Sequence, residues 1–213
     1  MKKIAFTCLS LLLITGISCK DAKKGQDGGA VELEAAPSEK FSLVKDSTKV
    51  SFTAYKTTEK LPVGGKFTKI NITNTTEGAT AMEALNGTTF NIPVSSLFTN
   101  DATGTRDPKI LEFFFGVMDN TELISGVFKV EGEDNCSIDV TLNGKTANIP
   151  LDHEMSGDNS YSFSGVMNLE NWDALNAVAS INKACEVLHT GKDGVSKTWS
   201  EVAVHADVLL QEK

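Results

Sequence analysis

The side chains that could support acid–base or metal chemistry are few in this sequence. Its three histidines, His153, His189 and His205, are far apart and lack the spacing of metal ligands. No Gly-x-Ser-x-Gly elbow, His-Glu-x-x-His pair or phosphate-binding glycine loop occurs. An enzyme would have to use His153 with its acidic neighbours, or Arg106 with Asp107. The sequence therefore favours binding over catalysis, and it predicts no metal and no cofactor.

The segment over residues 105–115, TRDPKILEFFF, is the most unusual part of the chain. It places Arg106, the only arginine, beside Asp107 and ends in three phenylalanines. A guanidinium can hold a carboxylate or backbone carbonyls in a fixed plane, which an ammonium group cannot do. Arg106 has three interpretations: chance in a lysine-rich sequence, a tie between this loop and a sheet, or contact with the polar head of a ligand. Residues 107–115 also predict a short helical segment.

The N-terminal residues carry an export signal. Lys2 and Lys3 precede an apolar run over residues 4–17, which is too short to span a bilayer of about 30 Å as a helix. The run ends in GISC, which resembles a bacterial lipobox, so we predict a signal peptide over residues 1–18 and lipidation of Cys19. Ordinary signal-peptidase cleavage is the alternative. Residues 19–40 lack an apolar period and are interpreted as a flexible tether. The signal peptide and the lipidated cysteine together predict an exported lipoprotein of the cell envelope, in the periplasm or at the outer membrane.

The composition excludes several classes of protein. Among 213 residues, 28 acidic and 20 basic side chains give a net charge of −8, which argues against a nucleic-acid partner. Without Lys2 and Lys3 the exported chain would carry −10. Phenylalanine is frequent, with 11 residues against 2 tyrosines and 2 tryptophans. This bias indicates apolar volume that either fills a core or receives a ligand.

From residue 41 onward, polar and apolar residues alternate between turn-rich breaks, which is typical of half-buried antiparallel strands. Asn143-Gly144 is a strong signal for a two-residue hairpin. Eight or nine strands at this spacing favour a closed or nearly closed barrel, although periodicity alone also allows a sandwich. The clearest stretches cover residues 50–55, 89–94, 124–130, 136–142, 147–155, 161–169 and 202–210.

One helix interrupts the strands. Apolar residues recur at intervals of three and four from Trp172 to Leu188, with Asn171 in position to cap the helix and Gly191 to end it. The sequence therefore predicts an all-β domain over residues 41–213 with one amphipathic helix at about residues 171–189.

The order of several segments resembles the YceI-like family of exported bacterial proteins. These segments lie at residues 41–45, 50–54, 63–67, 92–97, 106–114, 125–128 and 142–146, and the Arg-Asp to Phe-Phe stretch is the most specific of them. Thr57-Thr58 stands where the family usually has a histidine. The resemblance covers about residues 41–210. It implies a lipocalin-like antiparallel β-barrel of about eight strands, whose interior holds an isoprenoid or another long amphiphilic chain.

The inward-facing residues of such a barrel are the candidate ligand-binding residues. An apolar cavity would bind a lipid chain by removing its surface from water, and polar groups at the mouth would add specificity. The alternative is that the same side chains pack a solid core, which a short barrel permits. The candidates are Phe52, Phe67, Ile92, Arg106, Phe113, Phe114, Phe128, Ile149, Phe163 and Met167.

Two further cysteines point to the interior. Cys136 has the inward parity of its strand, and Cys185 lies on the apolar face of the predicted helix. In an oxidising compartment we predict a disulfide between them, with two buried thiols as the alternative.

These observations favour a non-enzymatic, membrane-tethered carrier that sequesters a long isoprenoid or quinone-like lipid. The main alternative is a solid-cored barrel that presents its loops to another protein of the cell envelope. The expected partners are the lipid and the membrane, which is reached through the N-terminal lipid anchor, and no nucleic acid is expected. The sequence also leaves room for a homodimer.

Overall fold

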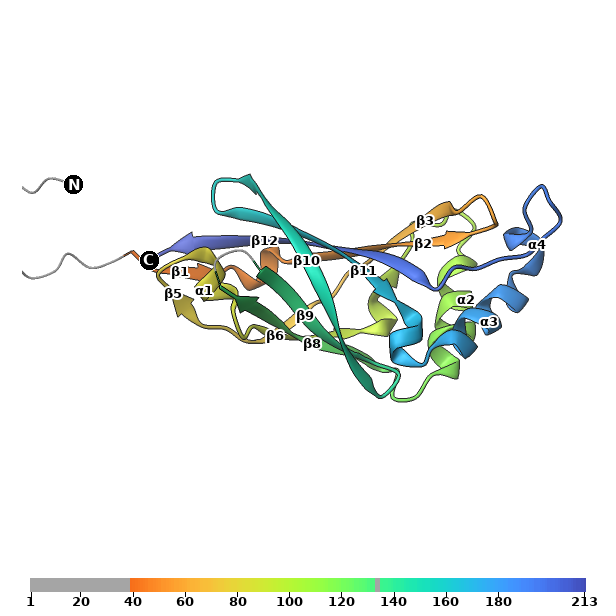
Figure 1. The fold of residues 1–213 in the computed structure, drawn as a ribbon, viewed down its shortest axis with the longest axis horizontal. Coiled ribbons are helices and arrows are strands. Elements are labelled where there is room, and N and C mark those ends of the chain that lie inside the picture. Colours follow the sequence, from red (N-terminus) through yellow and green to blue (C-terminus); the bar gives the residue numbers. More distant parts are fainter. Residues whose placement is uncertain (1–38, 133–134) are drawn as a thin grey trace, which may run out of the picture. The chain divides into compact units, whose positions relative to one another are not determined.

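The computed structural model describes residues 39–132 and 135–213. The predicted signal peptide, Cys19 and nearly all of the tether lie outside these residues. The described part is mostly β-structure, arranged as one large, curled antiparallel sheet with a few short helices (Figure 1). Among the described helices, none has both the length and the apolar character needed to cross a bilayer.

The described part contains twelve strands. They are β1 (Phe41–Leu43), β2 (Lys49–Lys56), β3 (Leu61–Phe67), β4 (Asn71–Asn74), β5 (Glu77–Gly78), β6 (Thr89–Pro93), β7 (Leu97–Phe98), β8 (Leu123–Glu131), β9 (Asn135–Leu142), β10 (Lys145–Gly157), β11 (Ser160–Asn168) and β12 (Glu201–Glu212). The α-helices and 3-10 turns are α1 (Ala81–Leu85), α2 (Arg106–Phe113), α3 (Leu175–Ala184), α4 (Glu186–His189), η1 (Lys45–Ser47), η2 (Val94–Ser96), η3 (Phe115–Val117) and η4 (Leu169–Trp172).

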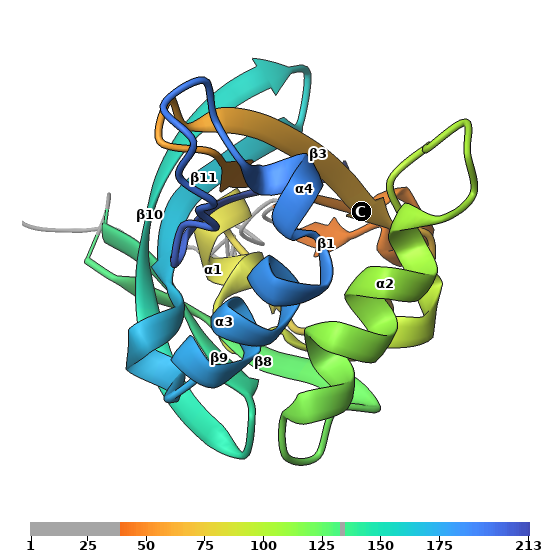
Figure 2. The ribbon, with the colours of Figure 1, turned by 90° about the vertical axis from the view of Figure 1, so that its right-hand side faces the viewer.

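The strands pair in the order β4-β6-β8-β9-β10-β11-β12-β2-β3-β7. The long strand β12 pairs with β11 along one edge and with both β1 and β2 along the other. Two very short strands extend the pairing: β5 follows β4 and pairs with β1, and β7 follows β6 and pairs with β3. Viewed along its length, the sheet curls around a common axis, with α2, α3 and α4 at the near end (Figure 2).

The predicted antiparallel strands are confirmed, and the twelve observed in the described residues exceed the eight or nine expected. The Asn143-Gly144 hairpin joins β9 to β10, with positive φ angles of 52° and 69° that a two-residue hairpin turn requires. The additional strands β1, β5 and β7 have only two or three residues each. An alternation of polar and apolar residues is not visible over such a length, so sequence periodicity could not reveal them.

The predicted single helix over residues 171–189 is wrong in its continuity. The chain forms η4, then α3, then α4, and it is interrupted at two places, residues 173–174 and residue 185. Asp173 adopts a left-handed conformation with φ 53°, and Cys185 leaves helical geometry with φ −116° and ψ 20°. The apolar period continues across both breaks because Trp172 and Cys185 are buried in the interrupted helix, as they would be in a continuous one. Periodicity reports which side chains are buried, and it does not detect these backbone breaks.

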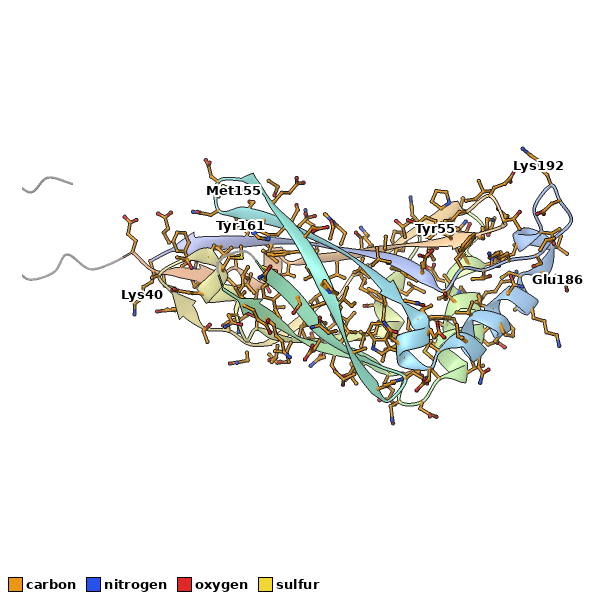
Figure 3. All side chains as sticks on the ribbon, in the orientation of Figure 1. Lys40, Tyr55, Met155, Tyr161, Glu186 and Lys192 are labelled. Carbon is orange, nitrogen blue, oxygen red and sulfur yellow. The ribbon has the colours of Figure 1, made fainter. Side chains whose placement is uncertain are left out.

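The buried side chains form two clusters along the axis of the sheet. The larger surrounds Trp172, which is fully buried and whose indole N–H donates to the carbonyl of Val140 at 2.8 Å. This cluster lies beside α2 and α3, at what we call the helical end. The second cluster surrounds α1 and includes Leu43, Leu85 and Phe163, at what we call the α1 end. In Figure 3, Tyr55 and Lys192 lie at the helical end, and Lys40 lies at the opposite end.

Helix α1 is short, and its start is stabilised by side chains. Thr80 precedes the helix, and its hydroxyl accepts a hydrogen bond from the N–H of Glu83 at 3.2 Å. The Glu83 carboxylate accepts in turn from the N–H of Ala79 at 2.8 Å. These bonds satisfy amide groups that a helix start leaves unpaired. Ala84 and Leu85 are thereby held inside the sheet, where they are almost fully buried.

Candidate cavity inside the curled sheet

A cavity of about 790 Å³ lies between the two clusters, inside the curl of the sheet. Its wall is made mainly of apolar side chains from the inward faces of the strands and from α2, α3 and α4. Its volume falls within the range of about 300–1,000 Å³ that is typical of small-molecule sites. The interior is therefore not filled by side chains alone.

Nine of the ten candidate residues line this cavity. The predicted inward parity was correct for each strand that contributes one, and Phe128 and Phe163 pack edge to face with ring centroids 4.9 Å apart. The nine are Phe52, Phe67, Ile92, Arg106, Phe114, Phe128, Ile149, Phe163 and Met167.

Phe113 is the one candidate that does not line the cavity. It is the last residue of α2, and the chain then continues through Phe114 into the 3-10 turn η3. Phe114 and Phe115 both reach the cavity and pack edge to face, with centroids 5.0 Å apart. Because the turn redirects the side chains after the helix ends, spacing along the sequence could not tell which two of the three phenylalanines face inward.

The cavity is enclosed at the α1 end. Leu43, Leu85 and Thr88 line it there, and each is at most 7% exposed. Thr48 also lines this end, and the hydroxyl groups of Thr48 and Thr88 are buried without a hydrogen-bond partner among the described residues. A buried hydroxyl without a partner loses its hydrogen bonds to water and gains none in return. The blind end is thus apolar except for two unsatisfied hydroxyl groups.

The cavity reaches the surface at the helical end. Its lining there includes Thr103 and Thr105, which are exposed, and Leu188, which is 58% exposed. Three half-buried basic side chains stand at this opening: Lys56 at the end of β2, and Arg106 and Lys109 on α2. The Asp101 carboxylate lines the same opening, so the mouth has three basic side chains and one acidic one, whereas the wall behind it is apolar.

Arg106 and Asp107 position α2 at this mouth. A guanidinium nitrogen of Arg106 lies 3.7 Å from the carboxylate of Asp101, which also accepts from the Thr103 hydroxyl and from the N–H groups of Thr105 and Arg106. The Thr103 hydrogen bond is the main reason why the pKa of Asp101 lies below its ordinary value. Arg106 therefore ties the 101–105 loop to its own helix, and it lines the cavity as well.

Asp107 holds the start of α2 against the sheet. Its carboxylate accepts from the backbone N–H of Thr99 at 3.1 Å and from the Thr99 hydroxyl at 2.5 Å. Thr99 directly follows strand β7. Asp107, and not Arg106, therefore makes the contact between this segment and the sheet that the sequence suggested for Arg106.

His189 is the titratable group at the mouth. Its Nδ1 lies 2.6 Å from the Thr198 hydroxyl, and Thr198 pairs through its backbone with Lys56. Partial burial, followed by the charges of Lys56 and Lys109, lowers the pKa of His189 below its ordinary value of 6.5. The imidazole is therefore neutral at neutral pH.

The sequence analysis missed three of these mouth residues. Lys109 follows Arg106 by three positions, which places both on one face of a helix, so this signal was available. Lys56 and His189 carried no such signal. They approach α2 only because the segment around Thr198 returns along β2, with the N–H of Trp199 donating to the carbonyl of Tyr55 at 3.0 Å.

The other two histidines lie away from the cavity mouth. His153 stacks on Phe163, with ring centroids 5.8 Å apart. His205 lies between Ser164 and Asp207 on the outer face of the sheet, 3.1 Å from an oxygen of each. Ser164, His205 and Asp207 have the residue types of a catalytic triad, but a catalytic serine also needs unpaired N–H donors nearby to stabilise an oxyanion. Ser164 stands on β11, between β10 and β12. We therefore assign the contacts among these three side chains to stabilisation across the strands.

Cys136 and Cys185 are both buried, as their parity predicted, but they are not bonded to each other. Cys136 belongs to the cluster at the α1 end, where its sulfur lies 3.7 Å from that of Met82. Cys185 lines the cavity near α4. A disulfide requires Cα atoms within about 7 Å of each other. The structure does not form the predicted disulfide, because a shared inward orientation does not bring two side chains to the same end.

Within residues 39–132 and 135–213, no three His, Cys, Asp or Glu side chains gather as a metal site requires.

Three solved structures are similar to this chain. The chain covers 98% of a polyisoprenoid-binding domain from Saccharophagus degradans, with 81% of its own length aligned, a TM-score of 0.56 and 12% identity. BcnA from Burkholderia cenocepacia aligns with a TM-score of 0.49 and 16% identity, over 77% of this chain and 96% of BcnA. The YceI protein of Campylobacter jejuni aligns with a TM-score of 0.45 and 17% identity, over 71% of this chain and 82% of that protein.

No curated protein matches this sequence. The first of these structures, at 12% identity, shows a shared fold alone. A family model, that of the YceI-like domain, matches residues 41–208, which is most of the chain. The resemblance inferred from the Arg-Asp to Phe-Phe segment and its neighbouring strands is confirmed: this chain belongs to the YceI-like domain family.

Proposed function

We propose that this protein binds a long-chain isoprenoid or quinone-like lipid in its cavity and carries or sequesters it without catalysing a reaction. The observation that supports this most directly is the cavity of about 790 Å³ with its apolar wall. The family match and the likeness to a polyisoprenoid-binding domain agree with it. Burial of an apolar chain would contribute about 25 cal/mol for each Å² removed from water, offset by the lost freedom of the chain.

We infer that the curled sheet closes into a barrel around this ligand. Two short strands support this inference, because they link the ends of the pairing order. The segment from β4 to β5 passes from β6 to β1, and the segment from β6 through η2 to β7 passes from β8 to β3. A closed barrel has no free edge at which a bound lipid would meet solvent or another chain.

We also propose that the domain is an exported lipoprotein held at a membrane by Cys19. The basic start, the apolar run and the lipobox-like GISC support this, and the residues up to 38 lie outside the described structure. Replacement of Cys19 with Ser should release the protein from the membrane fraction of a bacterial host. Retention of the Cys19→Ser variant in that fraction would contradict the lipid anchor.

A solid-cored barrel that acts only through its surface is the second candidate function. It requires that the inward phenylalanines fill the interior. The volume of the cavity favours the carrier over this alternative.

The lipid-binding proposal can be tested on the full-length protein produced in a bacterial host. The purified protein is extracted with organic solvent, and the extract is analysed by mass spectrometry. We expect a long-chain lipid in stoichiometric amount, or uptake of added geranylgeraniol by protein from which lipid has been removed. Repeated absence of a co-purified lipid, together with no uptake of geranylgeraniol, would overturn the proposal.

A further inference from the structure

We propose that the open end of the cavity is an anion site, in which Lys56, Lys109 and His189 hold the phosphate-like head group of the bound lipid while its chain extends toward the α1 end. This inference rests on the proposed function. It adds the charge of the head group and the direction in which the lipid enters.

The three groups converge from three separate elements. Lys56 ends β2, Lys109 stands on α2, and His189 ends α4, and all three line the cavity. Lys56 and His189 are linked through Thr198, which bridges the backbone of Lys56 and contacts His189 Nδ1 at 2.6 Å. Lys109 lines the same opening from α2, and the charges of Lys56 and Lys109 both lower the pKa of His189. The cluster therefore arises from tertiary packing and belongs to the mouth of one cavity.

The charges of Lys56 and Lys109 are not neutralised. Among the described residues, neither forms an ion pair, and each is half-buried. Lysines nearby in the chain behave differently: Lys60 pairs with Glu201 at 2.6 Å, and Lys192 pairs with Glu59 at 3.5 Å. Two partly desolvated cations without a counter-charge are stabilised by an oxyanion, which accepts strong, charge-assisted hydrogen bonds from ammonium groups.

The hydrogen bonds around His189 leave one of its nitrogens available. The amide oxygen of Asn182 accepts from the hydroxyls of Thr198 and Ser196, at 2.9 Å and 3.3 Å. The Thr198 hydroxyl donates its hydrogen to Asn182, so its oxygen accepts a hydrogen bond from His189 Nδ1. This network assigns the tautomer and leaves Nε2 as an acceptor. Nε2 can receive the hydrogen of a protonated phosphate oxygen, which complements the two ammonium donors.

The opposite end of the cavity does not suit an anion. Among the described residues, those that line this end include the hydroxyls of Thr48 and Thr88 and leucine and phenylalanine side chains, and no basic side chain stands with them. A charged head group buried there would lose its hydration without meeting a counter-charge. The structure therefore favours one orientation, with the charged head group at the helical end and the apolar chain directed inward.

The test uses two probes with the same tail, geranylgeranyl phosphate and geranylgeraniol, and measures their dissociation constants with full-length protein freed of lipid. A charge-assisted hydrogen bond is worth enough that we expect the phosphate to bind at least about tenfold more tightly than the alcohol. The Lys56→Gln/Lys109→Gln variant should lose this preference, measured as the ratio of its two dissociation constants. The control Lys66→Gln/Lys192→Gln, which removes the same charge from exposed lysines that do not line the cavity, should retain the preference.

Each outcome decides the matter. If the wild-type protein binds the phosphate no more tightly than the alcohol, or if the Lys56/Lys109 variant keeps the preference, the anion site is wrong while lipid binding stands. If neither probe binds, the proposed lipid-binding function fails as well. If inorganic phosphate alone binds as tightly as geranylgeranyl phosphate, the site takes a free anion and the head-group inference is overturned. Thermal unfolding of each variant shows that a loss of preference does not come from a loss of fold.

Discussion

The ring of Phe52 lies across Gly65, the residue directly opposite it on the neighbouring strand β3. A Cβ atom at Gly65 would overlap with this ring. Phe90 and Gly126 repeat the arrangement between β6 and β8. In both pairs the glycine leaves space for an aromatic ring to lie flat against the sheet. The rings thus cover the backbone and leave the middle of the cavity open.

Gly65→Ala should therefore reduce ligand binding. The added methyl group displaces the Phe52 ring from the wall, and the ring then occupies cavity volume or strains the sheet. We expect a lower thermal midpoint and weaker geranylgeraniol binding. Gly64→Ala is the matched control, because a Cβ there would meet only the carbonyl oxygen of Phe52, at an ordinary 3.9 Å. Equal binding by the Gly65→Ala and wild-type proteins would show that the ring position does not matter.

Trp172→Phe should destabilise the domain without removing the cavity. The substitution deletes an indole N–H that donates to Val140 from a fully buried position, and it leaves a small void. We expect a loss of about 1–3 kcal/mol in the free energy of unfolding, measured with urea. Trp199→Phe deletes a similar bond to Thr57, also 2.8 Å long, at a half-buried site. If Trp199→Phe lowered the free energy of unfolding more than Trp172→Phe, the burial of Trp172 would not explain its contribution to stability.

Thr88→Val should stabilise the protein, because Thr88 is only 5% exposed and its hydroxyl is buried without a hydrogen-bond partner among the described residues. Valine has nearly the same shape and carries no group that needs a hydrogen bond. We expect a gain of about 1 kcal/mol in the free energy of unfolding, together with tighter binding of an apolar tail.

The contrasting change is Thr99→Val, which removes a buried hydroxyl that donates to Asp107. This variant should be destabilised. If Thr88→Val instead weakens the binding of both geranylgeraniol and its phosphate, the polar end of the lipid lies at the α1 end, contrary to the proposed orientation.

The lipid-free protein should lose stability as the pH falls from 7 toward 5. Burial and the neighbouring Lys56 and Lys109 lower the pKa of His189 in the folded state, so the unfolded chain binds this proton more readily. The stability is complete above the ordinary value of 6.5 and decreases as the pH passes below it. Carboxylates with lowered pKa values, such as Asp101 and Asp193, contribute in the same direction only at lower pH. His189→Asn should flatten the profile between pH 7 and 5 in urea denaturation, and an unchanged slope would argue against this origin.

Affinity should rise with the length of the apolar chain until the cavity is filled. Each added methylene group contributes up to about 0.8 kcal/mol, which is about a fourfold change in dissociation constant. A series of straight-chain alcohols of increasing length should therefore show a steady gain followed by a plateau. An affinity independent of chain length would mean that the chain does not enter the cavity.

Much of the fold follows from short-range patterns. Alternating apolar residues gave the inward face of each long strand, and Asn143-Gly144 located the hairpin between β9 and β10. These features depend on neighbours in the chain, because the side-chain period of a strand and the φ angles of a turn are local properties. The breaks at Asp173 and Cys185 were missed because the apolar period continues across them.

The sequence by itself determined the family and the inward faces of the long strands, and nine of its ten candidate residues line the interior. Only the tertiary structure decided whether that interior is filled, because the space depends on how rings such as Phe52 lie over glycines of neighbouring strands. It also placed Cys136 and Cys185 apart and brought Lys56, Lys109 and His189 to one mouth. These contacts join residues far apart in the chain, and local periodicity carries information about the direction of a side chain and not about which distant side chain it meets.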